Sequence, residues 1–242
     1  IGQKLSNLSA YILNGCAKIA QAVLPQQCAL CGAGAPNRLL CAGCDADLSH
    51  HRAPACPICA LPALDGQICG ACLHRPPAFD RTLAAFSYRF PLDRLLHAFK
   101  YSGNLALVET LAKPLAQLAA GHPRPDLLMP MPLHPGRLRE RGFNQSLEIA
   151  RPISRWLDIP LAADACRRTR DTPTQAGLKW KERRRNVRGA FACDLDLCGK
   201  KIAVLDDVMT TGATLNEISR ILKDRGASEV GAWVVARALK RE

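Results

Sequence analysis

The sequence predicts an α/β protein, with a doubly wound and mostly parallel sheet that follows a small cysteine-rich N-terminal domain. Two observations predict this architecture. After residue 77, apolar stretches with strand character alternate with stretches whose apolar residues recur at helical spacing. Before that point, four Cys-x-x-Cys units lie in a Gly- and Pro-rich context. We therefore expect an amphipathic helix over 1–25, a cysteine-rich domain over 26–76 and an α/β domain over 77–242.

Composition limits the class of protein. The chain has 242 residues, of which 48% are hydrophobic and only 5% aromatic, so its core should be mainly aliphatic. No apolar run approaches the roughly 18 residues that a membrane helix requires. Polar residues interrupt the first 24 positions, which do not read as a signal peptide. We therefore expect a cytoplasmic protein without a transmembrane segment, in a compartment that keeps cysteines reduced.

The first stretch predicts an amphipathic helix that ends near Pro25. Its apolar residues fall on one face: Leu5, Leu8, Ile12, Cys16, Ile19 and Val23. The opposite face carries few positive charges, which favours packing on protein over binding to a membrane surface.

Eight of the 12 cysteines form pairs with the spacing of metal ligands. The pairs are Cys28 with Cys31, Cys41 with Cys44, Cys56 with Cys59, and Cys69 with Cys72. Each pair can place two thiolates on one ion, and two pairs complete a tetrahedral Zn²⁺ site. About fifty residues with so few large apolar side chains need such a staple to fold. We interpret 26–76 as a double zinc ribbon with about two structural zinc ions.

Disulfide bonds and redox chemistry are the alternatives to zinc binding, and the choice and pairing of the ligands are further open points. Disulfides suit a secreted chain, and redox chemistry needs one special pair in a thioredoxin-like context. His50 and His51 are candidate ligands, but eight cysteines already fill two sites. Pairing in sequence order is our preference, and a crossed arrangement stays open.

The α/β domain is expected to alternate strands and helices. The expected strands are 82–90, 126–131, 202–205 and 229–238, and the expected helices are 92–99, 105–118 with an interruption or kink at Pro114, 147–157 and 215–222. Ligands bind such sheets at the carboxyl ends of the strands. Pro132-Leu133-His134 and Asp206-Asp207 both follow strands, so we expect both to face one crevice.

The stretch from Lys201 to Leu215 is the most specific signal in the chain. An apolar strand, Ile202 to Leu205, is followed by Asp206 and Asp207, and then by a small-residue loop from Thr210 to Thr214. The free N–H groups and dipole of the helix that follows favour an anion, and Gly212 lets backbone approach it closely. We interpret the loop as a phosphate cradle.

A capped turn between a strand and a helix is the plainer interpretation of this stretch. The full order of residues is more restrictive, because four apolar residues, Asp-Asp, an apolar residue, any residue and Thr-Thr-Gly follow one another. It resembles the phosphoribosyl pyrophosphate signature of the type I phosphoribosyltransferases. No Gly-Lys-Ser/Thr and no three-glycine fingerprint is present, so nucleotide loops of those kinds do not fit.

Nearly the whole chain resembles the ComF family, also called GntX, which joins a double zinc ribbon to a phosphoribosyltransferase-like domain. The matching segments are the four cysteine pairs, 99–103, 130–133, 141–145, Arg168-Thr169 with Gln175, Arg185-Asn186, and 205–214. The resemblance implies a role in natural transformation, in the handling of incoming single-stranded DNA. It also implies DNA-uptake or recombination proteins as partners.

Phosphoribosyl transfer passes through a cationic state while pyrophosphate leaves, so its site must hold phosphates, Mg²⁺ and ribose. We assign the 5-phosphate to Thr210, Thr211, Gly212, Ala213 and Thr214, and the ribose hydroxyls to Asp206 and Asp207. The pyrophosphate is assigned to Leu133 and His134, with Lys100, Arg137 and Arg141 as neutralising charges. Without the resemblance, Lys100 and Arg137 are as well explained as surface charges. No catalytic nucleophile or base is evident.

The net charge of +12 is unevenly distributed, with fourteen Lys and Arg against six Asp and Glu between Arg137 and Arg188. Such a region suits a polyanion, either DNA or the ligand of a mobile basic flap. The flap or DNA contact is assigned to Arg167, Arg168, Arg183, Arg184 and Arg185. Two functions remain: a DNA-uptake factor with a phosphoribosyl pyrophosphate site, and an active phosphoribosyltransferase with an unknown nucleobase or amine acceptor.

Overall fold

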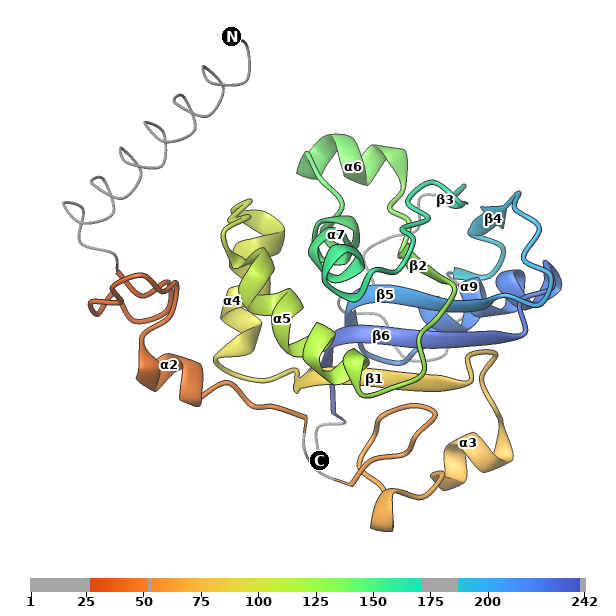
Figure 1. The fold of residues 1–242 in the computed structure, drawn as a ribbon, viewed down its shortest axis with the longest axis horizontal. Helices are drawn as coiled ribbons and strands as arrows, with labels where there is room; N and C mark the ends of the chain where they lie inside the picture. Colours follow the sequence, from red (N-terminus) through yellow and green to blue (C-terminus); the bar gives the residue numbers. More distant parts are fainter. Residues whose placement is uncertain (1–26, 52–53, 171–186, 240–242) are drawn as a thin grey trace, which may run out of the picture. The chain divides into compact units, whose positions relative to one another are not determined.

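The computed structural model describes residues 27–51, 54–170 and 187–239 (Figure 1). The chain divides into two compact units, Ile1–Leu48 and Ser49–Glu242. The predicted N-terminal helix and the central part of the basic stretch, including Arg183, Arg184 and Arg185, lie outside the described residues. In the part of the chain that is described, no helix has the length and apolar character needed to cross a membrane.

The first unit is built around one group of cysteines. Gln27 bridges Gly34 in antiparallel fashion, and the N–H of Cys28 donates to Ala33 O at 2.7 Å, which closes a tight turn. A short helix, α2 (Ala42–Ala46), begins directly after Cys41. Turn and helix together leave few buried apolar side chains, as expected for a metal-stapled module.

The second unit contains a four-stranded sheet with the order β1-β6-β5-β2, and all neighbouring strands are parallel. The strands are β1 (Arg81–Ser87), β2 (Leu127–Pro130), β5 (Lys201–Met209) and β6 (Glu229–Arg237). Ile202 to Leu205 are all buried, because helices cover both faces of β5. The carboxyl ends of β2, β5 and β6 lie at the same edge, since Pro130 pairs with Leu205 and Met209 with Arg237.

Helices α5 (Leu107–Ala120) and α7 (Gln145–Leu157) pack against one face of the sheet, as Figure 1 shows. Helix α9 (Ala213–Asp224) packs against the other face, where its apolar side chains share a core with Ile202, Val204 and Val230. Two short antiparallel strands, β3 (Cys166–Arg168) and β4 (Phe191–Cys193), contribute buried side chains to the same core as α9. Helices α4 (Leu92–Tyr101) and α6 (Pro135–Arg141) follow β1 and β2 and reach the carboxyl edge.

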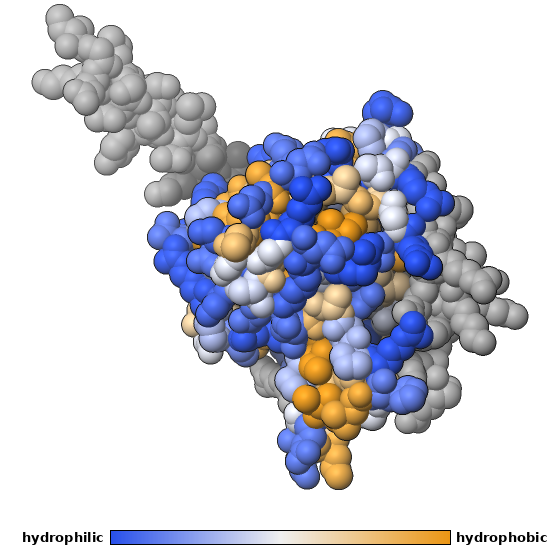
Figure 2. All heavy atoms as spheres, turned by 90° about the vertical axis from the view of Figure 1, so that its right-hand side faces the viewer, coloured by the Kyte–Doolittle hydropathy of each residue, from blue (hydrophilic) through white to orange (hydrophobic). Residues whose placement is uncertain are grey.

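The second group of cysteines lies in the same unit as the sheet. It is carried by residues 54–74, with η1 (Leu64–Gly66) and α3 (Gly70–His74). Thr82 of β1 joins this segment to the sheet: its N–H donates to Pro57 O at 3.0 Å and its hydroxyl to Ile58 O at 2.5 Å. Cys56, Cys59 and Cys72 are buried in the same core as α9. Leu64, Ile68 and Leu73 in this segment are exposed apolar side chains. Figure 2 shows apolar side chains gathered at the lower end of the molecule in that view.

The predicted α/β order is confirmed, with differences at the ends of the elements. β1 ends at Ser87 and not at residue 90, and α7 begins at Gln145, ahead of the predicted residue 147. Helix α5 is continuous through Pro114, so of the predicted interruption or kink the interruption was wrong. Buried Leu111 and Leu115 hold both halves of the helix against the sheet.

β5 is longer than predicted, because pairing with β6 continues to Met209. Asp206 and Asp207 therefore belong to the last part of the strand. Sequence patterns also missed the short elements α2, α3, α6, β3 and β4, whose length is too small for a recognisable periodicity.

Candidate functional site

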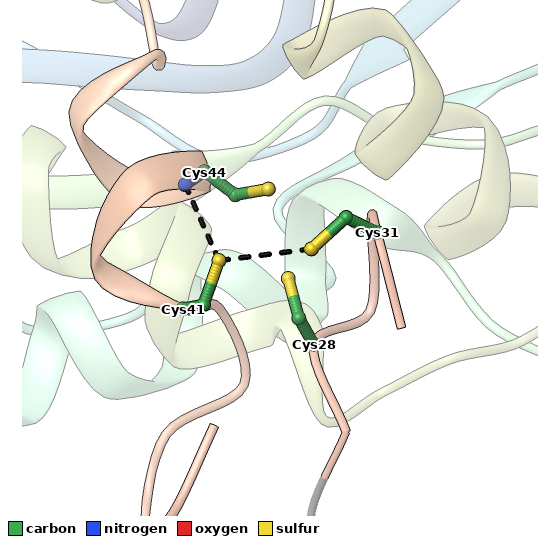
Figure 3. A group of neighbouring side chains, drawn as sticks. All are labelled: Cys28, Cys31, Cys41 and Cys44. Carbon is green, nitrogen blue, oxygen red and sulfur yellow. Dashed lines mark hydrogen bonds between the residues drawn. The ribbon is translucent and has the colours of Figure 1, made fainter. Parts of the chain in front are cut away.

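Two groups of four cysteines have their sulfur atoms within 4.8 Å of one another. The first comprises Cys28, Cys31, Cys41 and Cys44, whose side chains converge on a common centre in Figure 3, and the second comprises Cys56, Cys59, Cys69 and Cys72. The cysteines are thus grouped in sequence order, as we preferred. Neither His50 nor His51 belongs to these groups. Four sulfur donors around one centre suit a closed, structural Zn²⁺ site.

Local hydrogen bonds favour thiolate, the form that binds metal, at one cysteine of each group, whereas hydrogen bonds among the thiols together with burial raise the pKa of Cys44 and Cys72. Burial raises the pKa of Cys28, but backbone hydrogen bonds with Cys31 and Cys41 outweigh it and bring the value down to about 6. Cys56 behaves in the same way, with burial opposed by backbone hydrogen bonds with Cys69 and Cys59, and its pKa falls to about 7. Both turns therefore fit zinc in geometry and in donor chemistry.

We predict about two zinc ions per purified chain, because each group supplies a complete set of four thiolates. Cys44→Ser and Cys72→Ser should each lower the content to about one, as judged by metal analysis together with thiol titration. Cys198→Ser is the matched control, since this exposed cysteine lies outside both groups. Intact disulfides with metal content near zero would contradict the assignment.

A second candidate site is a pocket of about 230 Å³ at the carboxyl edge of the sheet. Asp206 and Asp207 from β5 and Thr214 from α9 meet the segment that follows β2 there. The other lining residues are Lys100, Met131, Pro132, Leu133, Arg137, Arg141, Asn144, Gln145, Ser146 and Arg168. Two carboxylates thus lie among several cationic side chains, an arrangement suited to a phosphate-bearing ligand with hydroxyl groups.

The acid pair is held by α4 and α7. Lys100 Nζ lies 2.9 Å from Asp207 Oδ2, and their side chains are 22% and 12% exposed. Burial lowers the pKa of Lys100, but the neighbouring Asp207 carboxylate raises it by more, so the ammonium is retained. Ser146 Oγ lies 3.3 Å from Asp206 Oδ1, which also accepts from the N–H of Asp207 at 2.9 Å. Lys100 is therefore a pocket residue and not a plain surface charge.

Asp206 has an unusual environment for a carboxylate. Burial, and next the charge of Asp207, raise the pKa of Asp206 to about 7, although Lys100 and two hydrogen bonds act in the opposite direction. Near neutral pH this group can therefore gain or lose a proton. It offers a ligand hydroxyl either an acceptor or a donor.

The residues after α6 shape the wall of the pocket. Asn144 caps α7 by accepting from the N–H of Ser146 at 3.0 Å, and its Nδ2 donates to Met131 O at 3.1 Å. Gln145 is only 3% exposed, and its Nε2 finds no hydrogen-bond acceptor among the described residues. Arg141 Cζ lies over the ring of Tyr101, 5.4 Å from the ring centroid. A buried donor at the wall is the kind of group that a ligand oxygen satisfies.

The loop before α9 has a conformation that requires glycine at position 212. Gly212 has φ +76°, and a Cβ there would lie 2.8 Å from Met209 Cε and 3.5 Å from Phe79 Cζ. Glycine is thus required by both backbone and space. Thr211 Oγ1 accepts from the N–H of Ala213 at 3.3 Å, and Gly212, the N-cap of α9, makes no side-chain cap. The dipole of the helix favours an anion at this end.

The predicted site residues are brought together only in part. The pocket contains Lys100, Leu133, Arg137, Arg141, Arg168, Asp206, Asp207 and Thr214, while Thr210, Thr211, Gly212 and Ala213 form the adjoining loop. His134 instead lines a neighbouring hollow of about 680 Å³ and accepts from the N–H of Gly136 to cap α6. Arg167 pairs with Asp194 at the surface.

Sequence reasoning assigned no role to Asn144, Gln145 and Ser146. The signal was present, because an Asn cap before an apolar helical pattern predicts a helix start. Since parallel strands bring their following segments to one edge, that helix start had to lie near Asp206.

Comparisons with known proteins agree with both parts of the chain. Residues 19–73 match the double zinc ribbon domain, and residues 144–242 match the phosphoribosyl transferase domain. Competence protein F of Haemophilus influenzae is 35% identical over 209 residues, which cover 82% of this chain and 90% of that protein. The chain belongs to the ComF family.

Two further comparisons describe the range of this likeness. DNA utilization protein YhgH of Escherichia coli O157:H7 is 38% identical over 191 residues, 76% of this chain and 84% of that protein. The crystal structure of purine phosphoribosyltransferase from Pyrococcus horikoshii aligns over 52% of this chain and 71% of that one, with 22% identity and a TM-score of 0.36.

We predict that Asp206→Asn stabilises the ligand-free protein at pH 8 but not at pH 4. An acid whose pKa is raised by burial stabilises the folded state at pH values below its unfolded pKa, near 4. This contribution to stability is lost as the pH rises through the folded pKa of about 7. The asparagine avoids burying a charge, so the gain should grow across this window and then level off. Urea unfolding at several pH values measures it. Asp158→Asn, at an exposed carboxylate, is the control, and an equal pH dependence in both variants would contradict the prediction.

Proposed function

We propose that this ComF-family protein binds phosphoribosyl pyrophosphate with Mg²⁺ in the pocket between Lys100 and Thr214, and assists the handling of incoming single-stranded DNA. The observation that carries the proposal is the meeting of the Asp206-Asp207 pair with a helix N-terminus whose N-cap is glycine and with several cationic side chains. Ribose hydroxyls, a terminal phosphate and a pyrophosphate need these three kinds of group together.

Each part of the ligand has protein groups of matching chemistry. The N-terminal end of α9, with the hydroxyls of the loop Thr210–Thr214, suits the 5-phosphate. The carboxylates of Asp206 and Asp207 suit the ribose hydroxyls. Arg137 and Arg141 line the pocket where the pyrophosphate would be neutralised. Mg²⁺, when bound with the ligand, would offset the charge of the phosphates and would be held mainly through ligand oxygens and water.

The DNA part of the proposal has independent support. Relatives that match most of the chain are named for competence and for DNA utilization. The excess of positive charge between Arg137 and Arg188 suits a polyanion. Arg137 and Arg141 place part of that charge at the pocket, and exposed Tyr101 beside Arg141 offers a ring for base stacking. DNA-uptake or recombination proteins in a cytoplasmic setting are the partners that this role implies.

A second candidate is an active phosphoribosyltransferase that joins a nucleobase or an amine to the ribose and releases pyrophosphate. The hollow of about 680 Å³ favours it, because this space shares Pro132, Leu133 and Arg168 with the pocket and offers room for an acceptor. Pyrophosphate release in a screen of nucleobases, amines and single-stranded DNA separates the two candidates. Turnover with one acceptor class favours the enzyme, and binding without turnover favours the DNA-uptake factor.

We predict that the wild type binds phosphoribosyl pyrophosphate in the presence of Mg²⁺, and that Asp206→Asn with Asp207→Asn weakens binding on the order of 100-fold or more. The reason is the loss of two charge-assisted hydrogen-bond acceptors, each worth about 2 kcal/mol. Calorimetry on both proteins measures the affinities, and circular dichroism confirms that the fold survives. Asp158→Asn should bind like the wild type. Equal affinity in the double variant would show that these carboxylates are not ligands.

We predict that single-stranded DNA binds with a steep salt dependence and weak sequence preference, because binding to phosphates dominates. Replacing Arg183, Arg184 and Arg185 by Ala should reduce the slope by up to about 2, at roughly 0.7 for each phosphate that is no longer neutralised. Fluorescence anisotropy over a salt series measures the slope.

The control for this experiment removes the same charge elsewhere, with Lys113, Arg124 and Lys200 replaced by Ala, three exposed positions outside the basic region. An equal loss of affinity in both triple variants would show that only net charge matters. If the arginine variant instead loses phosphoribosyl pyrophosphate and keeps DNA, the segment is a flap over the pocket.

A further inference from the structure

Arg237 is a buried cation at the carboxyl edge of the sheet, and only 2% of it is exposed. It is the last residue of β6, in register with Met209 of β5. Its guanidinium forms a fork: it donates hydrogen bonds to two segments that are far apart in the sequence, one at Cys59 and one at Met209 and Thr210. Nε donates to Cys59 O at 2.7 Å, and Nη1 donates to Met209 O at 2.9 Å and to Thr210 O.

One arm of this fork holds a metal-ligand turn. Cys59 belongs to the second cysteine group, and Ile58 beside it is held by the hydroxyl of Thr82 at 2.5 Å. Two consecutive carbonyls of the turn thus accept hydrogen bonds from side chains of the sheet. A divalent ion bound by four thiolates carries net negative charge, which suits a buried guanidinium nearby.

The other arm holds the start of the loop assigned to the 5-phosphate. Met209 O and Thr210 O directly precede Thr211 and Gly212, and Gly212 packs closely over the Met209 side chain. The direction of the following N–H groups depends on how the two carbonyls are held, because each peptide unit is planar. A shift of the guanidinium would therefore tilt the peptides that face the anion.

We propose that Arg237 is a positioning residue that couples the second cysteine group to the loop Thr210–Thr214, so that metal binding by Cys56, Cys59, Cys69 and Cys72 organises the site for the 5-phosphate. The identity of that phosphate rests on the proposed function. The coupling itself concerns the backbone of the loop and can be measured without ligand. The zinc turn is then part of the binding machinery and not only a folding staple.

The first experiment changes the guanidinium. Arg237→Met removes the fork with little loss of volume, and Arg237→Lys keeps the charge with a single donor group. Arg81→Met is the matched control. Arg81, the first residue of β1, pairs with Glu229, the first residue of β6, and both therefore lie at the opposite edge of the sheet from Arg237. Hydrogen exchange of the amides of 211–214, compared with Val204 in the middle of β5, reports on the loop. We expect faster exchange in the loop for Arg237→Met, a smaller effect for Arg237→Lys and none for the control.

The second experiment changes the metal in the full chain. Cys72→Ser and Cys44→Ser each remove one ligand, from the second and the first group respectively. We expect Cys72→Ser to speed exchange in 211–214, and Cys44→Ser to lose as much zinc while leaving the loop unchanged. Stepwise chelation of the wild type gives the same comparison without a mutation, with bound zinc measured in parallel.

Ligand affinity separates positioning from general destabilisation. Arg237→Met should weaken phosphoribosyl pyrophosphate binding by about 10- to 100-fold, the effect of one or two hydrogen bonds to a charged group. Mg²⁺-pyrophosphate, which lacks the 5-phosphate, should bind as in the wild type. If the wild type binds neither ligand, the proposed function fails, and hydrogen exchange still decides the coupling.

Several outcomes would overturn the proposal. Unchanged loop exchange in both Arg237→Met and Cys72→Ser is one, and equal losses of affinity for phosphoribosyl pyrophosphate and pyrophosphate are another. If Arg237→Met also loses protection at Val204, the fold has loosened, and Arg237→Lys together with chelation of the wild type decides. Loop exchange that tracks overall unfolding in those two measurements would reduce Arg237 to a structural residue.

Discussion

The parallel pairing of β5 with β2 on one edge and β6 on the other is the constraint on which the rest of the unit depends. It fixes Pro130 beside Leu205 and Met209 beside Arg237. All three strands therefore end at one edge, and the polar segments that follow them meet there. The helices that pack beside this edge bury Asp207 and part of Asp206, so these carboxylates of β5 have little contact with water outside the pocket.

That desolvation accounts for the electrostatics of the pocket. Two adjacent acids in water would repel weakly and stay ionised, but burial makes the charge of Asp206 unfavourable while Lys100 stabilises Asp207. The pair thus offers one firmly compensated carboxylate and one that titrates near neutrality. A ligand that brings its own cations and hydroxyl groups can relieve this imbalance, and such relief is a source of binding energy.

Both cysteine groups stabilise segments that have too few apolar side chains to fold alone, but the two groups have different surroundings. Each lies in a turn-rich segment with too little apolar surface to form a core, and each supplies four converging sulfur atoms. The first belongs to the unit that ends at Leu48, whereas the second shares a core with α9 and the sheet. Side chains of the α/β domain, Thr82 and Arg237, donate hydrogen bonds directly to the turn that carries the second group.

Local periodicity and spacing were enough to predict the order of the main strands and helices, the eight cysteine donors and a turn of small residues between β5 and α9, whereas the grouping of the cysteines into two sets came from the structure. The pattern also predicted that glycine is needed at 212 for a close approach of the backbone, and the structure adds a positive φ at this residue, which glycine adopts without strain. Tertiary structure decided the rest: the ion pair between Lys100 and Asp207, the place of Gln145 at the pocket wall, and the fork of Arg237. Each of these joins residues far apart in the chain, and no local pattern records which distant side chains a sheet will bring to its edge. Burial decided their chemistry as well, since the shift at Asp206 arises from desolvation that exists only after the helices have packed.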